Sequence, residues 1–208
     1  MNIIRKWQWS QCKWQKAIIV YDRFSSNPVK LIQLEYFVRN DFQQLIDWLK
    51  DDELLMNWSG SLFSFPLTQE SLEWYIQDVN IPDALAYIYK VVEPQTGKVI
   101  GHISLGSVSK KNRSARITRV LIGDLADRGK GYCKQMIKAV MKIGFEELNL
   151  HRISLGVYDF NSSAIKCYES AGLIIEGKQR DVLFFKDTWW SLVEMSMLQH
   201  EWQQKPAN

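Results

Sequence analysis

One junction in the middle of the chain limits its fold more than any other feature. A β-rich run over residues 114–123 is followed by DRGKGYCKQ, residues 127–135, and then by apolar residues at helical spacing. Two glycines beside a lysine, between a strand and a helix, place bare backbone directly before the free N–H groups of a helix's first turn. This arrangement is typical of a phosphate-binding loop, and a plain tight turn is the alternative interpretation.

Two common phosphate-binding patterns do not fit this junction. A Walker loop requires glycine at position 124 and Ser or Thr at position 131, where the chain has Asp124 and Gly131. A dinucleotide-binding fingerprint that starts at the first glycine requires another glycine where Lys134 stands. A third pattern has Arg or Gln, then Gly three residues later, then Gly or Ala two residues after that. Arg128 and Gly131 match it, and Cys133 is its one departure.

The rest of the chain is predicted to alternate between strands and helices. Apolar periodicity, caps and turn residues indicate the order β, α, α, β, β, β, α, β, α, β, β. Asn40 or Asp41, Thr68 and Asn161 are predicted N-caps, and Gly172 is a predicted helix stop. The expected strands are 29–36, 84–93, 98–109, 114–123 and 151–160 with a closing hairpin over 183–198, and the expected helices are 40–49, 68–79, 131–148 and 161–172.

Length and composition favour one globular domain. The chain has 208 residues, of which 46% are hydrophobic, enough to bury a continuous core. Residues 1–30 hold six Lys or Arg residues and one Asp, whereas the remainder holds 20 basic and 22 acidic residues. No broad nucleic-acid-binding face is therefore expected. We interpret residues 1–28 as a basic, Trp-containing extension or lid, with a polyanion-binding tail as the alternative, and residues 29–208 as the single domain.

The chain carries no sign of export or membrane insertion. Its apolar runs are far shorter than the roughly 20 residues that a membrane-spanning helix needs, and its beginning lacks the apolar core of a secretory signal. Its three cysteines, Cys12, Cys133 and Cys167, are an odd number without CxxC spacing. We expect them to stay unpaired in a reducing compartment, with the cytoplasm as the default location.

The glycine junction and the segment DFNSSAIKCYESAGL, residues 159–173, together resemble the GNAT N-acyltransferase superfamily. The likeness extends over about residues 29–202 and is strongest to the ribosomal-protein and N-terminal acetyltransferase branch, with similarity also to spermidine acetyltransferases. It implies a mixed α/β fold with a mostly antiparallel, twisted sheet and helices on both faces. The sheet would be splayed between its fourth and fifth strands, residues 114–123 and 151–160.

The resemblance also implies an acetyl-CoA-dependent N-acetyltransferase without a metal. The acceptor amine would attack acetyl-CoA directly in a ternary complex. Seven residues separate Asn161 from Tyr168, so both lie on one helix face, and the Tyr168 hydroxyl would protonate the leaving thiolate. The residues that the resemblance assigns to acetyl-CoA binding are Leu121, Ile122, Gly123, Arg128, Gly129, Lys130, Gly131, Tyr132, Cys133 and Asn161.

The general base and the acceptor stay open at this point. The strand 114–123 contains no carboxylate, which leaves His102, Glu35 and Asp159 as candidate bases. The acceptor could be a protein N-terminal amine, a polyamine, an aminoglycoside or an amino acid. Residues 50–80 include acidic residues and Trp58, which could hold a cationic amine or simply form a solvated helix end. The acidic residues are Asp51, Asp52 and Glu53.

Two further alternatives are a non-catalytic acyl-CoA-binding sensor on the same fold and a nucleic-acid-binding protein that uses the basic head. A homodimer also stays open as the assembly state.

Overall fold

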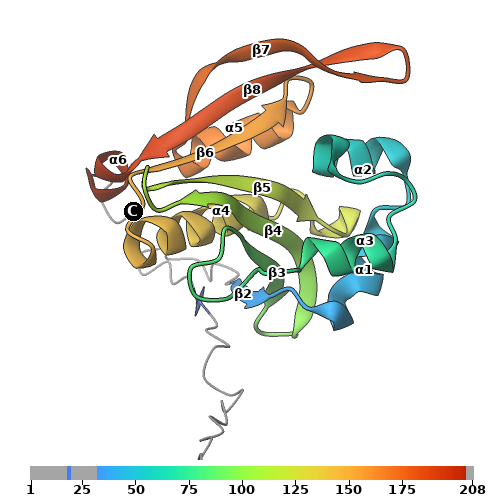
Figure 1. Ribbon diagram of the computed structural model, residues 1–208, viewed down its shortest axis with the longest axis horizontal. Helices are drawn as coiled ribbons and strands as arrows, with labels where there is room; N and C mark the ends of the chain where they lie inside the picture. The colour runs from blue at the N-terminus through green and yellow to red at the C-terminus, as the bar shows by residue number, and fades with distance from the viewer. Residues whose placement is uncertain (1–17, 20–31, 205–208) are drawn as a thin grey trace, which may run out of the picture.

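The computed structural model describes residues 18–19 and 32–204, and its centre is a twisted sheet of eight strands (Figure 1). The strands lie side by side in the order β1-β2-β3-β4-β5-β6-β8-β7. Neighbours are antiparallel except for β5 and β6, which are parallel, so the expected mostly antiparallel sheet is confirmed. The bounds are β1 Ile18–Ile19, β2 Gln33–Tyr36, β3 Tyr87–Glu93, β4 Lys98–Ser109, β5 Ser114–Ile122, β6 Arg152–Tyr158, β7 Ile174–Phe185 and β8 Thr188–Leu198.

Strands β5 and β6 pair over only three residues and then separate. The pairs begin with Ser114 opposite Arg152 and end with Arg116 opposite Ser154. Beyond Arg116, no strand among the described residues lies beside the edge of β5 that faces β6, so alternate backbone N–H and C=O groups on that edge lack a strand partner there. The expected splay is therefore confirmed. The strands expected as the fourth and fifth, residues 114–123 and 151–160, are β5 and β6, because β1 comes before them in the structure.

A β-bulge bends β5 where the gap opens. Thr118 and Leu121 lie opposite Ser104 and His102, so β5 carries one residue more than β4 in this stretch. Arg119, inside the stretch, has a φ of 54°, a left-handed conformation that side chains other than glycine rarely adopt. Because a bulge increases the local twist and bends its strand, it helps to turn the end of β5 away from β6.

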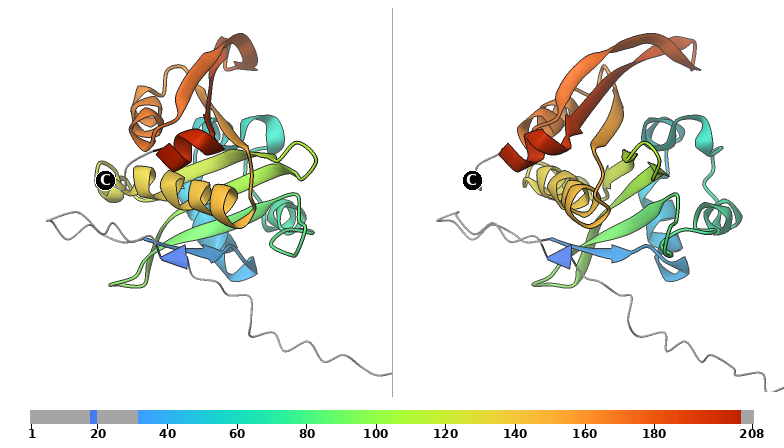
Figure 2. Two further views of the ribbon diagram at one scale, coloured as in Figure 1. Left: turned by 90° about the vertical axis from the view of Figure 1, so that its left-hand side faces the viewer. Right: turned by 60° about the vertical axis from the view of Figure 1, so that its left-hand side comes forward.

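Helices cover both faces of the sheet, as expected (Figure 2). Helices α1, α2 and α3 pack on one face around an apolar cluster that includes Phe42, Leu55 and Leu72. Helices α4 and α5 pack on the other face in a larger cluster that includes Met136 and Tyr168. The bounds are α1 Phe42–Trp48, α2 Asp52–Ser59, α3 Gln69–Tyr75, α4 Tyr132–Lys142, α5 Ser162–Ala171 and α6 Gln199–Gln204, with 3-10 turns η1 Arg39–Asp41, η2 Gly60–Leu62 and η3 Leu125–Asp127 and the π-helical turn η4 Ile143–Glu147.

Local sequence explains where several helices begin and end. The Thr68 side chain accepts a hydrogen bond from the N–H of Ser71, and that of Asn161 accepts one from Ala164, caps that each contribute about 1 kcal/mol. Helix α5 ends at Gly172, whose φ of 103° suits glycine. These predictions are confirmed. The apolar periodicity expected over residues 131–148 is confirmed as well, because the helix buries the side chains of Met136, Ile137, Val140, Met141 and Ile143.

Some elements were not predicted from the sequence. Helices α2 and α6 were absent from the predicted order, and β7 starts at residue 174 rather than 183. Asp41 precedes α1 as expected, but its carboxylate accepts from the N–H of Val38 and pairs with Lys90 rather than capping the helix. The hypothesis of an extension over residues 1–28 lies outside the described residues except for Ile18–Ile19, which pair with β2.

The last two strands form a long hairpin that arches away from the body of the molecule (Figures 1 and 2). Strand β7 is an edge strand of the sheet and is exposed along most of its length. In the part of the chain that the structure describes, no helix is both long and apolar enough to cross a membrane.

Candidate functional site

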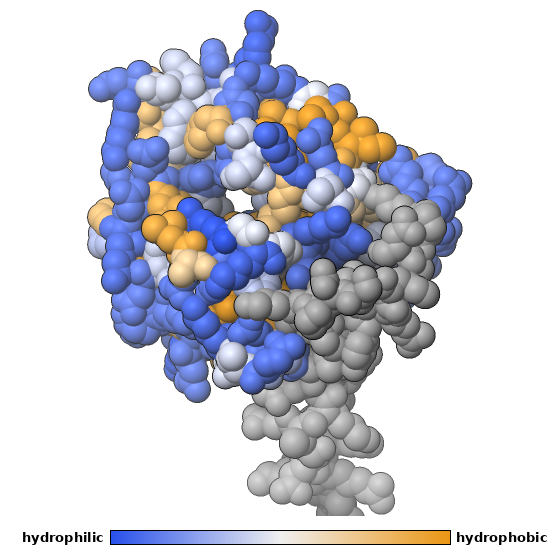
Figure 3. Space-filling view, turned by 180° about the vertical axis from the view of Figure 1, so that it is seen from behind, coloured by the Kyte–Doolittle hydropathy of each residue, from blue (hydrophilic) through white to orange (hydrophobic). Residues whose placement is uncertain are grey.

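The gap between β5 and β6 is a cleft of about 800 Å³. Its walls come from β5, β6, α2, α5, residues 127–134 except Lys130, and Leu192 of β8. Seen from behind, the surface is hollowed near the middle of the face (Figure 3). The cleft therefore joins the glycine junction, the opened strand and the Asn161–Tyr168 helix, three features that lie apart in the sequence.

One buried carboxylate holds the glycine loop in place. Asp127 is 5% exposed, and its two oxygens accept hydrogen bonds from Nζ of Lys130 at 2.8 Å and Nζ of Lys98 at 2.7 Å. These bonds, first that of Lys130, lower the pKa of the Asp127 carboxyl. Because Lys130 is turned toward Asp127, it is absent from the cleft wall, which Arg128 does line.

The two glycines leave open space where the loop enters α4. Gly129 and Gly131 have φ values of 75° and 81°, and a Cβ on either would meet no atom within 4 Å. The N–H groups of the first turn of α4, residues 132–134, have no partner inside the helix and lie at the cleft. Open space, bare backbone and the positive end of a helix fit a pyrophosphate.

Tyr132 contributes only its backbone to this end of the cleft. Its hydroxyl donates to Glu93 of β3 at 2.5 Å, which turns the ring into the core. Burial, together with the bond to Glu93, raises the pKa of Tyr132 to about 12.

Two of the three predicted strand residues line the cleft. Leu121 and Ile122 do so, whereas Gly123 does not. The N–H of Gly123 donates to the carbonyl oxygen of Ile100 at 3.0 Å, and a Cβ at this glycine would overlap the Trp48 ring. Gly123 is thus the point where α1 packs closely on the end of β5.

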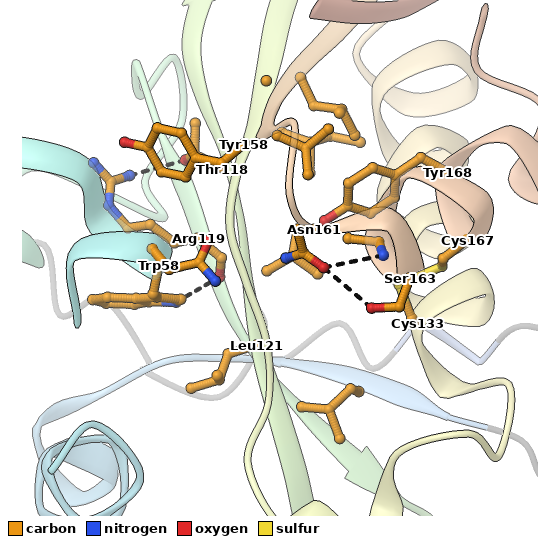
Figure 4. Close-up of a pocket in the computed structure, with 18 of the residues that line it drawn as sticks. Trp58, Thr118, Arg119, Leu121, Cys133, Tyr158, Asn161, Ser163, Cys167 and Tyr168 are labelled. Carbon is orange, nitrogen blue, oxygen red and sulfur yellow. Dashed lines mark hydrogen bonds between the residues drawn. A yellow bond between two sulfur atoms is a disulfide. The ribbon is translucent and has the colours of Figure 1, made fainter. Parts of the chain in front are cut away.

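Asn161 and Tyr168 both face the cleft from α5 (Figure 4). The side-chain oxygen of Asn161 accepts from Ser163 Oγ at 3.1 Å and from the N–H of Ala164 at 3.2 Å, so this oxygen is engaged in capping. Tyr168 is 7% exposed, and burial raises the pKa of its hydroxyl. The hydroxyl therefore carries its proton at neutral pH and can donate it.

A disulfide joins the two helices of this wall. Cys133 of α4 is bonded to Cys167 of α5, with their Cα atoms 6.5 Å apart (Figure 4). The expectation that these cysteines stay unpaired is wrong, because sheet and helix packing brings together two residues that the sequence separates by 34 positions. The cysteine-based argument for a reducing compartment loses its basis. The bond links the first turn of α4 to the residue before Tyr168.

The three candidate bases are all engaged elsewhere. His102 is 1% exposed, its Nδ1 lies 3.1 Å from the carbonyl oxygen of Arg119, and burial lowers its pKa to about 3. Glu35 lies 3.5 Å from Lys90, and Asp159 pairs with Lys178. None of the three candidates lines the cleft.

Helix α2 closes the other end of the cleft. Trp58 lines it, and its indole Nε1–H donates to the carbonyl oxygen of Arg119 at 3.0 Å. The neighbouring acidic residues do not line it, because Asp51 caps α2 and Asp52 pairs with Lys186 at 2.6 Å. Glu53 is also absent from the wall. Of the residues 51–58 proposed to hold a cationic amine, the aromatic one reaches the site and the acidic ones do not.

Sequence reasoning missed several residues of this end. Arg119 lies inside a run that was interpreted only as a strand, although an arginine in a central strand is itself an unusual signal. Tyr158, Phe160 and Leu192 come from β6, the following loop and β8, and no local pattern links them. Within the described residues, no group of three or more His, Cys, Asp or Glu side chains could hold a metal ion.

Comparison with known proteins points to one family. The model of the acetyltransferase (GNAT) domain matches residues 32–174. An uncharacterized prophage-derived N-acetyltransferase of Bacillus subtilis, YokL, is 26% identical over 74% of this chain and 82% of its own length. A spermidine N(1)-acetyltransferase of Vibrio cholerae is 29% identical over 54% of this chain and 64% of its own. The crystal structure of a Vibrio cholerae spermidine N-acetyltransferase with CoA and spermine shares the fold, with a TM-score of 0.71 and 24% identity over 83% of this chain and 98% of that one.

Proposed function

This chain belongs to the acetyltransferase (GNAT) family, and on that premise we propose that it transfers the acetyl group of acetyl-CoA to a primary amine. One observation carries the proposal: a single cleft holds the glycine loop, the unpaired edge of β5 and the buried hydroxyl of Tyr168. The family match supports acetyl transfer in general, and the roles of individual residues are our own assignment.

The loop end of the cleft suits the pyrophosphate of acetyl-CoA. Gly129 and Gly131 would admit its oxygens to the backbone, and the first N–H groups of α4 would bind them, with Arg128 at the rim. Asp127 pairs with Lys130, and Asp124 and Asp127 both pair with Lys98. This leaves Arg128 and Lys134 as the cations on the cleft wall at this end. We assign Cys133 a backbone role, since its sulfur is bonded to Cys167.

The pantetheine arm would bind along the opened edge of β5 in the way that a further strand would pair with it. Leu121 and Ile122 line the cleft, and their backbone groups would lie beside the end of the arm. An N–H group directed at the thioester carbonyl oxygen would stabilise the negative charge that develops there. Gly123 would support this stretch by close packing with Trp48 rather than by a hydrogen bond of its own.

Acetyl-CoA supplies the activated acetyl group. The acceptor nitrogen, entering as the free amine, forms a bond to the acetyl carbon, the carbon–sulfur bond breaks, and the sulfur leaves as a thiolate. The nitrogen gives up one proton to water as the amide forms. Tyr168, protonated at neutral pH, would donate its hydroxyl proton to that sulfur. Asn161 would hold the N-terminus of α5 and so fix the position of Tyr168 two helical turns later.

One observation favours a second candidate function, a sensor that binds acyl-CoA without turnover. Among the described residues, the single carboxylate on the cleft wall is Asp127, and it is paired with two lysines, so no general base faces the acceptor. An amine that enters as the free base loses one proton only as the amide forms, and water can take up that proton.

Calorimetric titration with acetyl-CoA, followed by a thiol-release assay over a panel of amines, separates the two functions. The panel contains a polyamine, an aminoglycoside, a peptide with a free N-terminus and the amino acids. Binding with turnover of at least one amine is expected. Binding without turnover of any amine would favour the sensor, and absence of binding would overturn both.

A further inference from the structure

The charges at the acceptor end of the cleft do not suit a polyamine, which is a cation and would need acidic side chains. Figure 4 shows Trp58 and Arg119 on one side of β5, and Tyr168 and the Cys133–Cys167 pair on the other. If acetyl-CoA enters from the loop end, the acceptor must approach from the side of Trp58 and Arg119.

The wall at this end offers a cation and no free anion. Among the described residues that line the cleft, Asp127 is the one carboxylate, and it lies at the loop end with Lys130 and Lys98 bound to it. Arg116 is neutralised by a two-pronged pair with Glu194, at 2.8 Å for both bonds. Arg119 has no acidic partner in the part of the chain that the structure describes.

The Arg119 guanidinium makes few hydrogen bonds for a partly buried charged group. In the described part of the chain, its Nη1 donates to Thr118 Oγ1 at 2.9 Å, and its carbon lies 5.0 Å from the centre of the Tyr75 ring. Its Nε is buried without a hydrogen-bond partner among the described residues. A partly buried guanidinium normally binds a carboxylate or phosphate through several N–H groups, so an anion is missing from its surroundings.

The backbone at Arg119 is held firmly in an uncommon conformation. Its φ is 54°, and its carbonyl oxygen lies within hydrogen-bond distance of two rings, Trp58 Nε1 at 3.0 Å and His102 Nδ1 at 3.1 Å. Residues kept in sparsely populated conformations by their surroundings concentrate at functional sites. Trp58 and His102 thus hold the backbone of Arg119 and fix the direction in which its side chain leaves the strand.

We propose that Arg119 binds the carboxylate of the acceptor, and that the acceptor is an amine with a carboxylate close to its nitrogen, such as a free amino acid, rather than a polyamine. The inference rests on the proposed acetyltransferase function. A polyamine would bring several ammonium groups to a wall whose unpaired charge is positive, whereas an amino acid would pair its carboxylate with the guanidinium.

This pairing also helps to explain how transfer proceeds without a general base on the cleft wall. The carboxylate of an amino acid stabilises the ammonium form of its own amine, and an ammonium cannot attack. Once Arg119 neutralises the carboxylate, that stabilisation is lost. The amine pKa falls, and a larger fraction is present as the nucleophilic free base.

The test compares each amino acid with its own amide, which keeps the amine and loses the carboxylate, and includes spermidine. In the thiol-release assay the wild-type protein is expected to use the preferred amino acid at least tenfold better than its amide, judged by kcat/KM, and better than spermidine. Arg119→Gln should reduce kcat/KM for the amino acid by about tenfold to a hundredfold, the effect of losing hydrogen bonds to a charged group, and leave the amide unaffected. The acetyl-CoA dissociation constant should not change.

Lys111→Gln is the matched control, because it removes one positive charge at an exposed position outside the cleft and should preserve the preference. A wild-type protein that acetylates spermidine or the amides as well as any amino acid would overturn the Arg119 assignment and leave the proposed function standing. If no amine is acetylated, the proposed function itself fails. Should Arg119→Gln not fold, the wild-type comparison of acid with amide still decides the question.

Discussion

At the scale of single residues, Tyr168 carries the most specific assignment. Its hydroxyl is protonated at neutral pH and faces the cleft. We expect Tyr168→Phe to lower kcat by about 10²-fold, the usual contribution of a positioned acid, with little change in the acetyl-CoA dissociation constant. Tyr89→Phe is the matched control, because Tyr89 is equally buried but lies outside the cleft. Steady-state kinetics with the amine found in the panel and calorimetry measure the two quantities. Full activity of Tyr168→Phe would show that another group supplies the proton.

His102 makes the stability of the molecule depend on pH. Its pKa of about 3 in the folded chain lies below the ordinary value of 6.5, chiefly because of burial. The unfolded chain therefore binds one more proton between pH 6.5 and 3, and the free energy of unfolding falls as the pH drops through this window, by up to about 1.4 kcal/mol per pH unit. The stabilisation is complete above pH 6.5.

We expect His102→Phe to lose this increment of acid sensitivity. A phenyl ring can occupy the same aromatic cluster, where His102 lies 4.9 Å from Phe37 and 5.4 Å from Trp58 between ring centres. The Arg119 carbonyl keeps the bond from Trp58. Urea denaturation at pH 7, 6 and 5 would measure the effect. Parallel decreases in the wild type and the variant would contradict the assignment.

At the scale of elements, the junction of β5, loop and α4 decides whether acetyl-CoA binds. Gly131→Val would place a branched side chain in the space that the loop leaves open. The dissociation constant of acetyl-CoA should rise at least tenfold. The φ of 81° adds strain of about 1 kcal/mol or more for any side chain, so a control must carry the same strain.

Gly97 provides that control. It has a φ of 70° in the turn between β3 and β4, open space around it and no place on the cleft wall. Gly97→Val should therefore lower the melting temperature to a similar degree while acetyl-CoA binding stays normal. If both variants bind acetyl-CoA like the wild type, the phosphate-loop assignment is removed.

At the scale of the whole molecule, the β7–β8 hairpin exposes apolar side chains at the edge of the sheet. β7 is a long edge strand, and the rings of Phe184 and Trp189, exposed by 54% and 58%, contact each other in a tilted arrangement with centres 4.9 Å apart. Exposed edges with apolar side chains favour association. We expect the protein to form a dimer in light-scattering measurements, and the double substitution Phe184→Glu and Trp189→Glu to shift it to the monomer.

Leu85→Glu serves as the control for that shift, since Leu85 is 72% exposed far from the hairpin in the sequence and lines no part of the cleft. It should leave the dimer intact. A wild-type protein that stays monomeric at every concentration would rule the hairpin contact out.

The sequence by itself determined the features that depend on neighbours along the chain. Thr68 and Asn161 cap their helices through bonds that span three residues, Gly172 stops a helix by its own backbone freedom, and the glycines at 129 and 131 mark the loop. The strand and helix periods around that loop were also readable. The loop and the segment 159–173 carried the resemblance to the family, and the splayed sheet was expected from that resemblance.

Only the tertiary structure decided which groups meet in the cleft. Cys133 and Cys167 pair because α4 and α5 pack on the same face, and Lys130 leaves the wall because Asp127 is buried beneath it. Arg119 could be recognised as a candidate binding residue only in the folded chain. There it lies in the bulge of β5 near α2, and its Nε is buried without a hydrogen-bond partner among the described residues. Charge pairing and burial depend on residues distant in the chain, so no local pattern could reveal them.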